Sequence, residues 1–367
     1  VPADLQRRCA ERYIADRHPV VGSRPPAEPL NVTRRRLKVG YLSGDFANHP
    51  IGYQMLAIAR HHDRSRIEVN ALSLQSRDDP YHARIRESAE HFVDLAGRAT
   101  EDIVHEVRRR RLDIVVDLQG HTQHGRFDLL AARLAPLQLN YLCPSTSGAP
   151  FLDAIISDEI AIPSGHEPHY TERVHRVPVS SFIAEYADIH LPAIPSRASQ
   201  GLRPDTVVLA SFAESYKITR EIWAIWMRLM ARHPQCQLWL GLRSVPDVAN
   251  DLRQRAAAAG IDPARIVLAT YAPSRAAHLA RLPLADLGLD THLYNGHTTT
   301  ADLLHAGVPV VTASSDTLCG RLGGSIVAAA GLPELVVPDL AQYEQAVERA
   351  VSDLSLIHIS EPTRPER

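Results

Sequence analysis

The chain has 367 residues, of which 45% are hydrophobic and 22% charged, and its formal net charge is −2. This composition is ordinary for a globular protein, and the length predicts two domains rather than one. A nearly neutral chain produces no strong field for nucleic acid or for an anionic membrane surface, so we expect neither as a partner.

The distribution of apolar residues and cysteines favours a cytoplasmic protein. No apolar run is long enough to cross a membrane, and the sequence shows no signal peptide. The four cysteines lie far apart and form no C-x-x-C pair; they are Cys9, Cys143, Cys236 and Cys319. This spacing argues against a disulfide framework and against a cysteine metal site, so a reducing compartment is expected.

Both ends of the sequence differ from the rest. Residues 1–36 are expected to be a truncated helical segment followed by a linker rich in proline and arginine. Residues 354–367 resemble the translation of an adapter used in DNA library preparation, so we expect the natural sequence to stop near Asp353. We therefore expect native sequence to be missing at both ends.

From Arg36 onward, apolar runs alternate with helical patterns. In the first half, strands are predicted at 37–42, 68–74, 91–95, 113–118 and 137–142, and helices at 52–59, 81–89, 101–110 and 127–134. Residues 150–200 are rich in proline and are expected to be irregular, with the domain crossover among them. In the second half, strands are predicted at 207–210, 237–240, 266–268, 285–289 and 308–311, and helices at 221–231, 248–259, 275–281 and 303–306. Two such series predict two Rossmann-like domains, residues 37–198 and 199–353, that face each other across a cleft.

The most informative stretch is the loop between the strand at 285–289 and the helix that follows it. The strand runs into Asp290, and the helix opens on His297 and three threonines. Thr299 and Asp302 have the spacing of a capping pair. A helix N-terminus with free N–H groups, hydroxyls and an imidazole suits a diphosphate. An ordinary capped helix would fit this segment equally well.

Other polar loops follow predicted strands, where parallel sheets bind their ligands. The loop at 43–52 places Asp45 near His49, a pair suited to removing a proton or orienting an acceptor. Alternatively, Asp45 and Asn48 serve only turn and capping geometry. The loop at 119–126 is rich in histidine, and the loop at 143–148 is small and polar, as a sugar site would be. Lys217, in the loop that begins at residue 211, could neutralise a leaving phosphate.

Several common nucleotide motifs are missing from the sequence. No G-x-G-x-x-G follows the first strand, and no G-x-x-x-x-G-K-[ST] occurs. There is no D-x-D motif either, so a metal-bound sugar nucleotide is not indicated and we expect neither a metal nor a cofactor. The arginine run at 108–111 is expected to be a solvated helix end.

Taken in order, these loops resemble the catalytic region of the protein O-GlcNAc transferases and their bacterial relatives. The matching segments are Val39–Pro50, Thr146–Pro150, Tyr216–Ile218, Leu289–Asp302, Ala306–Thr312 and Gly331–Leu335. The resemblance covers roughly residues 37–347, and the joint occurrence of the segments is specific. It implies a GT-B fold and a metal-independent, inverting transfer of a sugar from a UDP-sugar, most often UDP-GlcNAc, to Ser or Thr of a protein acceptor. Family members often carry upstream tetratricopeptide repeats, of which residues 1–36 show none.

The resemblance also implies roles for individual residues. On the donor side, His297, Thr298 and Thr299 would bind the diphosphate, beside Glu214 and Tyr216, and Lys217 would stabilise the leaving UDP. Asp302 would hold the ribose, while His278, Arg281 and the backbone of Ala272 would hold the uridine. Asp45 and His49 would lie beside the sugar and the acceptor, and the sugar pocket would be lined by Pro50, Leu142 and Cys143. Departure of UDP would then develop negative charge where a cation and a helix N-terminus converge.

Three positions depart from the family pattern. Glu214 stands where the family usually has glutamine or asparagine, and Ser274 replaces a frequent lysine. Cys143 belongs to a loop one residue shorter than the usual Gly-Tyr-Pro-Gly segment. A carboxylate near a diphosphate is repulsive unless it is paired or protonated. The alternatives are therefore a non-catalytic sugar-nucleotide-binding scaffold, or a GT-B glucosyltransferase or epimerase; a related branch that glucosylates asparagine leaves the donor sugar open.

Overall fold

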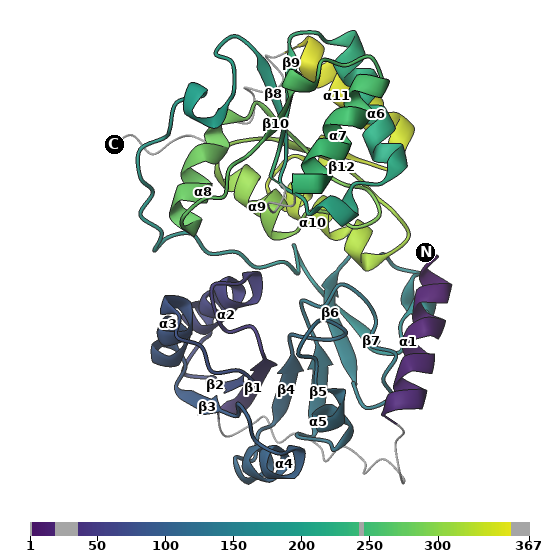
Figure 1. Ribbon diagram of the computed structural model, residues 1–367. Coiled ribbons are helices and arrows are strands. Elements are labelled where there is room, and N and C mark those ends of the chain that lie inside the picture. The colour runs from purple at the N-terminus through teal and green to yellow at the C-terminus, as the bar shows by residue number, and fades with distance from the viewer. Residues whose placement is uncertain (1, 19–35, 242–245, 354–367) are drawn as a thin grey trace. The chain divides into compact units, whose positions relative to one another are not determined.

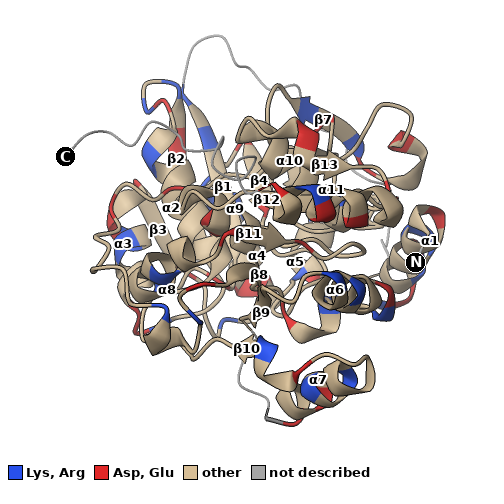
Figure 2. Cartoon of the chain, turned by 90° about the horizontal axis from the view of Figure 1, so that it is seen from above, with Lys and Arg blue, Asp and Glu red and all other residues tan. Residues whose placement is uncertain are grey.

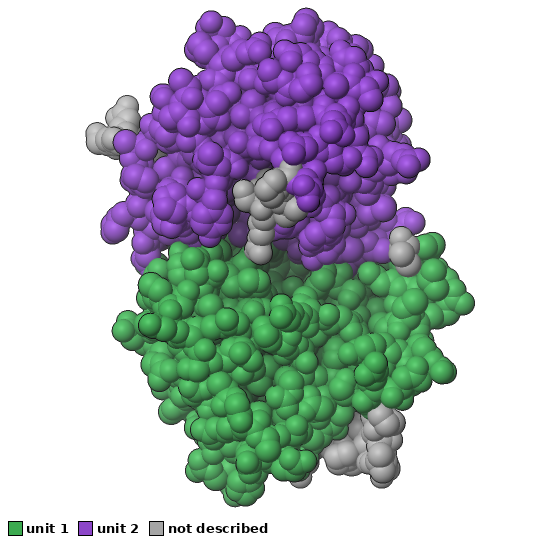
Figure 3. Space-filling model, in the orientation of Figure 1, with its two compact units in different colours: residues 1–185 green, residues 186–367 purple. Residues whose placement is uncertain are grey.

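The structure is a computed structural model that describes residues 2–18, 36–241 and 246–353. The chain divides into two compact units, residues 1–185 and 186–367 (Figure 3). Each unit contains one sheet with helices packed on it (Figure 1). The prediction of two successive α/β halves is therefore confirmed.

The sheet of the first unit has seven parallel strands in the order β3-β2-β1-β4-β5-β6-β7. The strands are β1 Leu37–Ser43, β2 Ile67–Ser73, β3 His91–Asp94, β4 Ile114–Asp117, β5 Leu137–Asn140, β6 Ala154–Asp158 and β7 Arg173–Val177. The helices are α1 Ala3–Arg17, α2 Pro50–His61, α3 Pro80–Ser88, α4 Thr100–Arg109 and α5 Phe127–Ala131. The strand order changes direction between β1 and β4, so the loops that follow these two strands flank the point where such sheets bind ligands.

The prediction that residues 150–200 are irregular is wrong in part, because β6 and β7 lie there. Their signal in the sequence is weak. β6 is only five residues long, and β7 is an edge strand in which arginine, valine and histidine alternate with little burial. Pro163 and Pro168 between them are typical of loops, which hides the two strands.

The sheet of the second unit has six parallel strands in the order β10-β9-β8-β11-β12-β13. The strands are β8 Val207–Ser211, β9 Cys236–Leu240, β10 Ile266–Leu268, β11 Leu287–Leu289, β12 Val310–Ala313 and β13 Val336–Val337. The helices are α6 Arg220–Arg232, α7 Pro246–Ala258, α8 Arg275–Arg281, α9 Thr298–His305, α10 Leu322–Ala329 and α11 Leu340–Ser352. The order changes direction between β8 and β11, which places their following loops at the ligand-binding edge.

The first residues after the division pack on the second unit. Tyr186 and Ile189 contact the apolar core formed by β8, β9 and the helices α8 and α9. The Tyr186 ring also stacks on His305 of α9, with the ring centroids 3.8 Å apart. The division therefore falls before Tyr186, whereas the sequence placed the change of domain at residue 198.

Both sheets are buried on their two faces, which explains why most strands are rich in apolar residues. In the first unit, one face packs around Leu42 and Val115, and the other around Tyr41 and Met55. In the second unit, Trp226 lies in the core on one face of the sheet. Parallel strands covered on both sides need continuous hydrophobic runs, and this is the pattern that made them predictable.

Helix α1 packs on the first unit through Ile14, which is buried in its core, and through a contact with Gly148. Gly148 has a φ of +69°, and a Cβ there would lie 2.3 Å from the backbone carbon of Ala10. The helical expectation for the start of the chain is thus confirmed for 3–17. The expected linker at 22–36, except for Arg36, and the expected adapter-derived tail lie outside the described residues.

Charged residues of both signs are interspersed on the helices of both units (Figure 2). Helix α7, for example, carries Asp247 and Asp251 together with Arg253 and Arg255. In the part of the chain that the structure describes, no helix has the length and apolarity needed to cross a bilayer.

We predict that Gly148→Ala destabilises the first unit more than Gly165→Ala does. Both glycines have a positive φ, but a Cβ at Gly165 would meet no described atom within 4 Å. Gly165→Ala should therefore cost only the left-handed strain, about 1 kcal/mol. Gly148→Ala adds a collision with α1 and should cost about 3 kcal/mol in total. Chemical denaturation measures both losses of unfolding free energy. Equal losses would show that α1 shifts away from the added Cβ without a measurable cost in stability.

Candidate active site

In the first unit, Gln119 joins the loops that follow β1 and β4. Its Nε2 donates to Asp45 Oδ2 at 2.6 Å. Its Oε1 accepts from the Ser43 hydroxyl at 2.7 Å and from the Gly44 N–H at 3.1 Å. Gln119 is buried, so one side chain fixes the Asp45 carboxylate relative to both strands. The sequence placed Gln119 in a candidate loop without giving it a function.

His49 is the N-cap residue of α2, and Pro50 is the first residue of that helix, where proline is favoured. The His49 side chain is 43% exposed, so a substrate can reach it, and its Nδ1 lies 4.0 Å from Asp45 Oδ2. Nδ1 accepts the Ile51 N–H at 3.3 Å, which places the proton of a neutral ring on Nε2. If the proton moved to Nδ1, beside Asp45, Nε2 would be able to accept a proton from a hydroxyl group.

The backbone between Asp45 and His49 is held by a histidine that no sequence motif identifies. His82, on α3, is buried, and its Nδ1 donates to the carbonyl oxygen of Phe46 at 2.8 Å. The Phe46 ring is itself buried in the core. The loop that carries the two candidate catalytic residues is therefore anchored at its centre.

The loop that follows β5 is held by the buried carboxylate of Glu172. This group accepts from the Thr146 hydroxyl at 2.6 Å, the Ser147 N–H at 2.8 Å and the Asn140 amide at 2.9 Å. Burial alone would raise the pKa of Glu172, but these hydrogen bonds outweigh it and lower the pKa. Glu172 is therefore an ionised structural anchor.

Two of the predicted sugar-pocket residues lie directly after β5. Leu142 has a φ of +61°, which is rare for a residue with a side chain and is often found at functional sites. Cys143 is buried against Gly120, where a Cβ would lie 2.8 Å from the sulfur. Burial raises the pKa of Cys143 well above its usual value, so the thiol stays protonated and does not act as a nucleophile.

In the second unit, the N-terminus of α9 differs from the sequence prediction. Thr299 and Asp302 do not form a capping pair: the N-cap residue is His297, and no described side chain caps the helix. Asp302 is instead engaged by Arg275 of α8. The first turn, with Thr298 and Thr299 as its first two residues, therefore keeps its N–H groups clear of a side-chain cap, as an anion site requires.

Lys217 lies at the loop that leads into α9. It ends the short 3₁₀ helix η3, Ser215–Lys217, and its Nζ donates to the carbonyl oxygen of Asn295 at 3.0 Å. The ammonium also sits over the Tyr294 ring, 3.8 Å from its centroid. Burial lowers the pKa of Lys217, and the nearby Asp290 opposes that shift. Lys217 thus lies beside the loop that leads into the N-terminus of α9, and that the two bind a diphosphate together stays a prediction.

His297 is neutral at neutral pH, because burial and the nearby Lys217 lower its pKa to about 3. Its Nε2 lies 3.3 Å from the carbonyl oxygen of Cys319. Because a carbonyl oxygen can only accept a hydrogen bond, Nε2 must carry the proton of the neutral ring. Nδ1 is then an acceptor. In this geometry, a phosphate could accept hydrogen bonds from the threonine hydroxyls, the backbone N–H groups and Lys217. The His297 ring could donate to it only after breaking its hydrogen bond to Cys319.

Glu214 is the N-cap residue of η3, and Tyr216 directly precedes Lys217 in that helix. The backbone carbonyl oxygen of Glu214 accepts the backbone N–H of Lys217 at 2.9 Å. The Glu214 carboxylate favours the charged form of the Lys217 side chain. Tyr216 is 72% exposed, and its ring meets Tyr294 edge to face at 6.2 Å. The carboxylate that departs from the family pattern is therefore within electrostatic reach of Lys217.

On the predicted uridine side, Arg281 organises the loop that contains Ala272. Arg281 is buried, and its guanidinium donates to the Thr270 carbonyl and, at 3.1 Å, to His278 Nδ1. Burial and the neighbouring Arg281 lower the pKa of His278 to about 4, so the ring is neutral. Ser274, which replaces the usual lysine, caps α8 through its hydroxyl.

Asp302, the predicted ribose ligand, is buried and already accepts three hydrogen bonds. Arg275 binds both of its oxygens, at 2.8 and 3.1 Å, and the Tyr186 hydroxyl donates to Oδ1 at 2.9 Å. A carboxylate oxygen can accept two hydrogen bonds, so Oδ2 can still accept one more. Arg275 and Tyr186 were not identified from the sequence, because no motif connects them with Asp302.

The sequence profile of glycosyl transferase family 41 matches residues 16–194 and 189–360, nearly the whole chain. The chain belongs to this family. A probable UDP-N-acetylglucosamine–peptide N-acetylglucosaminyltransferase from Arabidopsis thaliana is 33% identical over 342 residues, which are 91% of this chain and 35% of the relative. The chain thus spans about a third of the length of the curated relatives that it matches.

Solved structures give the same fold. A mutant of the Thermobaculum terrenum O-GlcNAc transferase superposes with a TM-score of 0.86 at 29% identity, covering 96% of this chain and 67% of that one. The glycosyltransferase WaaG, of lipopolysaccharide biosynthesis, superposes with a TM-score of 0.51 at 13% identity, covering 88% and 93%. The second likeness concerns the fold alone. The family 41 chain has the GT-B fold that the sequence predicted.

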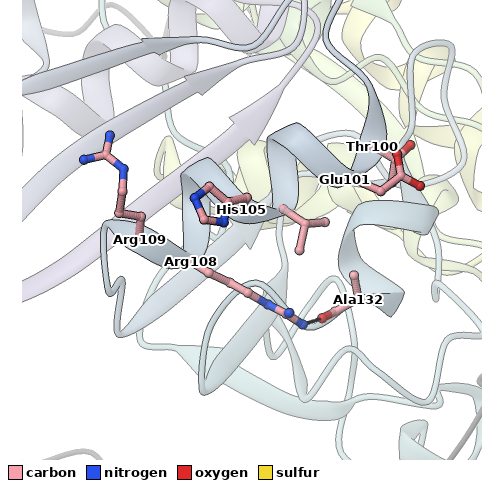
Figure 4. A pocket seen from close by; sticks show the side chains of 7 residues that line it. Thr100, Glu101, His105, Arg108, Arg109 and Ala132 are labelled. Carbon is pink, nitrogen blue, oxygen red and sulfur yellow. Dashed lines mark hydrogen bonds between the residues drawn. The ribbon is translucent and has the colours of Figure 1, made fainter.

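A cavity of about 600 Å³ on this family 41 chain lies away from the candidate residues. It runs beside α4 and is lined by Thr100, Glu101, Val104, His105, Arg108, Arg109 and Ala132 (Figure 4). Arg108 reaches across it to the carbonyl oxygen of Ala132. Within the described ranges, no three His, Cys, Asp or Glu side chains are grouped as metal ligands would be. That the site needs no metal stays a prediction.

We predict that Arg275→Met lowers the free energy of unfolding of the second unit by about 3 kcal/mol, because it leaves the buried Asp302 carboxylate without its cation. Arg255→Met is the control: Arg255 pairs with Asp251 at 2.7 Å on the surface, and its loss should cost under about 1 kcal/mol. Denaturation followed by tryptophan fluorescence isolates this unit, which holds all three tryptophans. Adding Asp302→Asn should restore part of the loss, and no restoration would disprove the coupling.

Proposed function

We propose that this chain is the catalytic region of a protein glycosyltransferase that moves a sugar from a UDP-sugar to Ser or Thr hydroxyls of proteins. The observation that carries the proposal is the position of Lys217 beside the uncapped N-terminus of α9. Departing UDP develops negative charge on its terminal phosphate, and a fixed ammonium together with helix N–H groups stabilises such charge most in the transition state. The resemblance to N-acetylglucosaminyltransferases supports GlcNAc as the sugar.

In the proposed reaction, the acceptor hydroxyl attacks the anomeric carbon while the bond to UDP breaks, so the configuration inverts. His49 takes the hydroxyl proton in the tautomer that faces Asp45, and Lys217 balances the charge on UDP. The uridine lies against Ala272 and His278, and no cofactor is required. Upstream tetratricopeptide repeats and a cytoplasmic location belong to the same proposal and are supported by the family resemblance.

Glu214 supports a second candidate, a scaffold that binds sugar nucleotides without transfer. Its carboxylate acts on Lys217 and would repel a diphosphate that is not fully neutralised. The two functions differ in what they release. An enzyme produces free UDP and a heavier acceptor protein, whereas a scaffold binds UDP and produces neither.

The test incubates the full chain with UDP-GlcNAc or UDP-glucose and a mixture of acceptor proteins, then measures free UDP and protein mass. We expect UDP release with GlcNAc added to protein, and the same rate in EDTA. Binding without release would favour the scaffold. A rate restored only by Mn²⁺ or Mg²⁺ would contradict metal-independent transfer, and release matched by no gain in protein mass would indicate a small-molecule acceptor or hydrolysis.

We predict that Lys217→Ala lowers kcat about 100-fold while UDP still binds, because the ammonium acts mainly on charge that develops during the reaction. The chain offers a matched control, because it contains only two lysines and Lys38 lies on β1, paired with Glu68 at 4.0 Å. Lys38→Ala should leave kcat unchanged. Steady-state kinetics and calorimetry with UDP measure the two quantities, and an unchanged kcat in Lys217→Ala would refute the role of this lysine.

A further inference from the structure

Asp290, the residue directly after β11, is a buried carboxylate to which the proposed reaction gives no function. Only 4% of it is exposed. Its Oδ1 accepts the N–H groups of Thr291 at 2.8 Å and Gly296 at 2.6 Å. Its Oδ2 accepts the hydroxyl of Thr312, on β12, at 2.8 Å. One carboxylate therefore closes the loop between β11 and α9 and ties it to the neighbouring strand.

The same point is braced from the other side of the sheet. The backbone carbonyl of Asp290 accepts the hydroxyl of Tyr343, from α11, at 3.0 Å, and that hydroxyl accepts the indole N–H of Trp226, from α6, at 3.2 Å. Gly323 of α10 leaves the room that the carboxylate occupies, because a Cβ there would lie 2.3 Å from Oδ2. Two helices thus fix the backbone of Asp290, and a third makes way for its side chain.

The loop that Asp290 closes contains Asn295, the residue to which the Lys217 ammonium donates a hydrogen bond. The side-chain amide of Asn295 donates to the Thr291 carbonyl and accepts the Gly323 N–H at 3.2 Å. Because these hydrogen bonds hold the residue in place, its backbone carbonyl oxygen faces the Lys217 ammonium at a fixed position. The Asp290 carboxylate is also the nearby charge that most opposes the lowering of the Lys217 pKa by burial. A buried carboxylate is expensive unless a cation and hydrogen-bond donors surround it, and here both are present.

We propose that Asp290 is a positioning residue of the donor site: it shapes the loop before α9 and supplies the negative charge that keeps Lys217 cationic. The inference rests on the proposed function, since it explains how the cation for the leaving diphosphate is maintained. It assigns Asp290 no contact with substrate. Its charge, and not only its hydrogen bonds, is required.

The pH dependence follows from the groups around the pair. Lys217 faces Asp290, Glu214 and Cys319, together with the neutral ring of His297. Asp290 faces Lys217 and the hydroxyl of Tyr343. Burial raises the pKa of Asp290 to about 6, so the carboxylate is ionised above that pH and holds the lysine charge there. Loss of the Asp290 charge must shift the titration of Lys217 to lower pH.

Asp290→Asn tests the charge, because the amide keeps the shape of the side chain. Thr312→Val is the matched control: it removes a hydrogen bond to Asp290 and keeps the charge. Lysine labelled with ¹³C and ¹⁵N gives only two side-chain signals in this chain, and Lys38 is an internal reference. The NMR titration of Lys217 needs no catalytic turnover, so it reports on Asp290 even where transfer fails.

We expect Asp290→Asn to move the Lys217 titration to lower pH, with Lys38 unchanged, and to lower kcat about 100-fold. Thr312→Val should leave the titration in place and lower kcat far less. An unmoved titration in Asp290→Asn, or equal losses of kcat in the two variants, would overturn the proposal. If Asp290→Asn does not fold, the titration of the unmodified chain is the test. The Lys217 signal of that chain must then show an inflection near pH 6, where Asp290 titrates, and absence of this inflection refutes the coupling. Failure of the parent chain to bind UDP would instead refute the proposed function.

Discussion

The hydrogen bonds that the buried Asp290 carboxylate accepts are the interactions on which the loop before α9 depends. A carboxylate removed from water at the end of β11 needs hydrogen-bond donors and positive charge around it: the loop before α9 supplies two N–H groups, β12 supplies the Thr312 hydroxyl, and Lys217 of η3 supplies the charge. The same loop presents the N–H groups of the α9 first turn. Stability of the fold and readiness for an anion therefore have one physical origin, and a change that removes the hydrogen bonds of Asp290 should loosen both.

Much of this architecture could be predicted from the sequence, for a simple reason. Parallel strands covered on both faces are rich in apolar residues, and β8 opens with such a run at 207–210, whereas Lys38 interrupts the apolar pattern of β1. The resemblance also brought together Lys217 and the start of α9. Helix α10 was harder to find, because Gly323 and Gly324 interrupt its pattern, although Gly323 is needed where Asp290 approaches.

What the sequence could not give is the direction in which a side chain faces. Spacing allowed Thr299 and Asp302 to form a capping pair, but the fold turns Asp302 toward Arg275 and leaves the helix end open. Likewise His82 and Gln119 hold the loop of Asp45 and His49 from α3 and from the end of β4. Such partners are distant in sequence and belong to no motif, so only three-dimensional contacts identify them.

The close approach of Gly323 to Asp290 also constrains how this protein can evolve. Any side chain at position 323 would strike Oδ2 of Asp290, so the two positions are not free to vary independently. A Cβ at 323 would also lie 2.9 Å from the Cβ of Asn295, so loss of the Asp290 carboxylate alone would not make room for a larger residue. Replacement of Gly323 therefore requires changes at both Asp290 and Asn295, which no single substitution supplies.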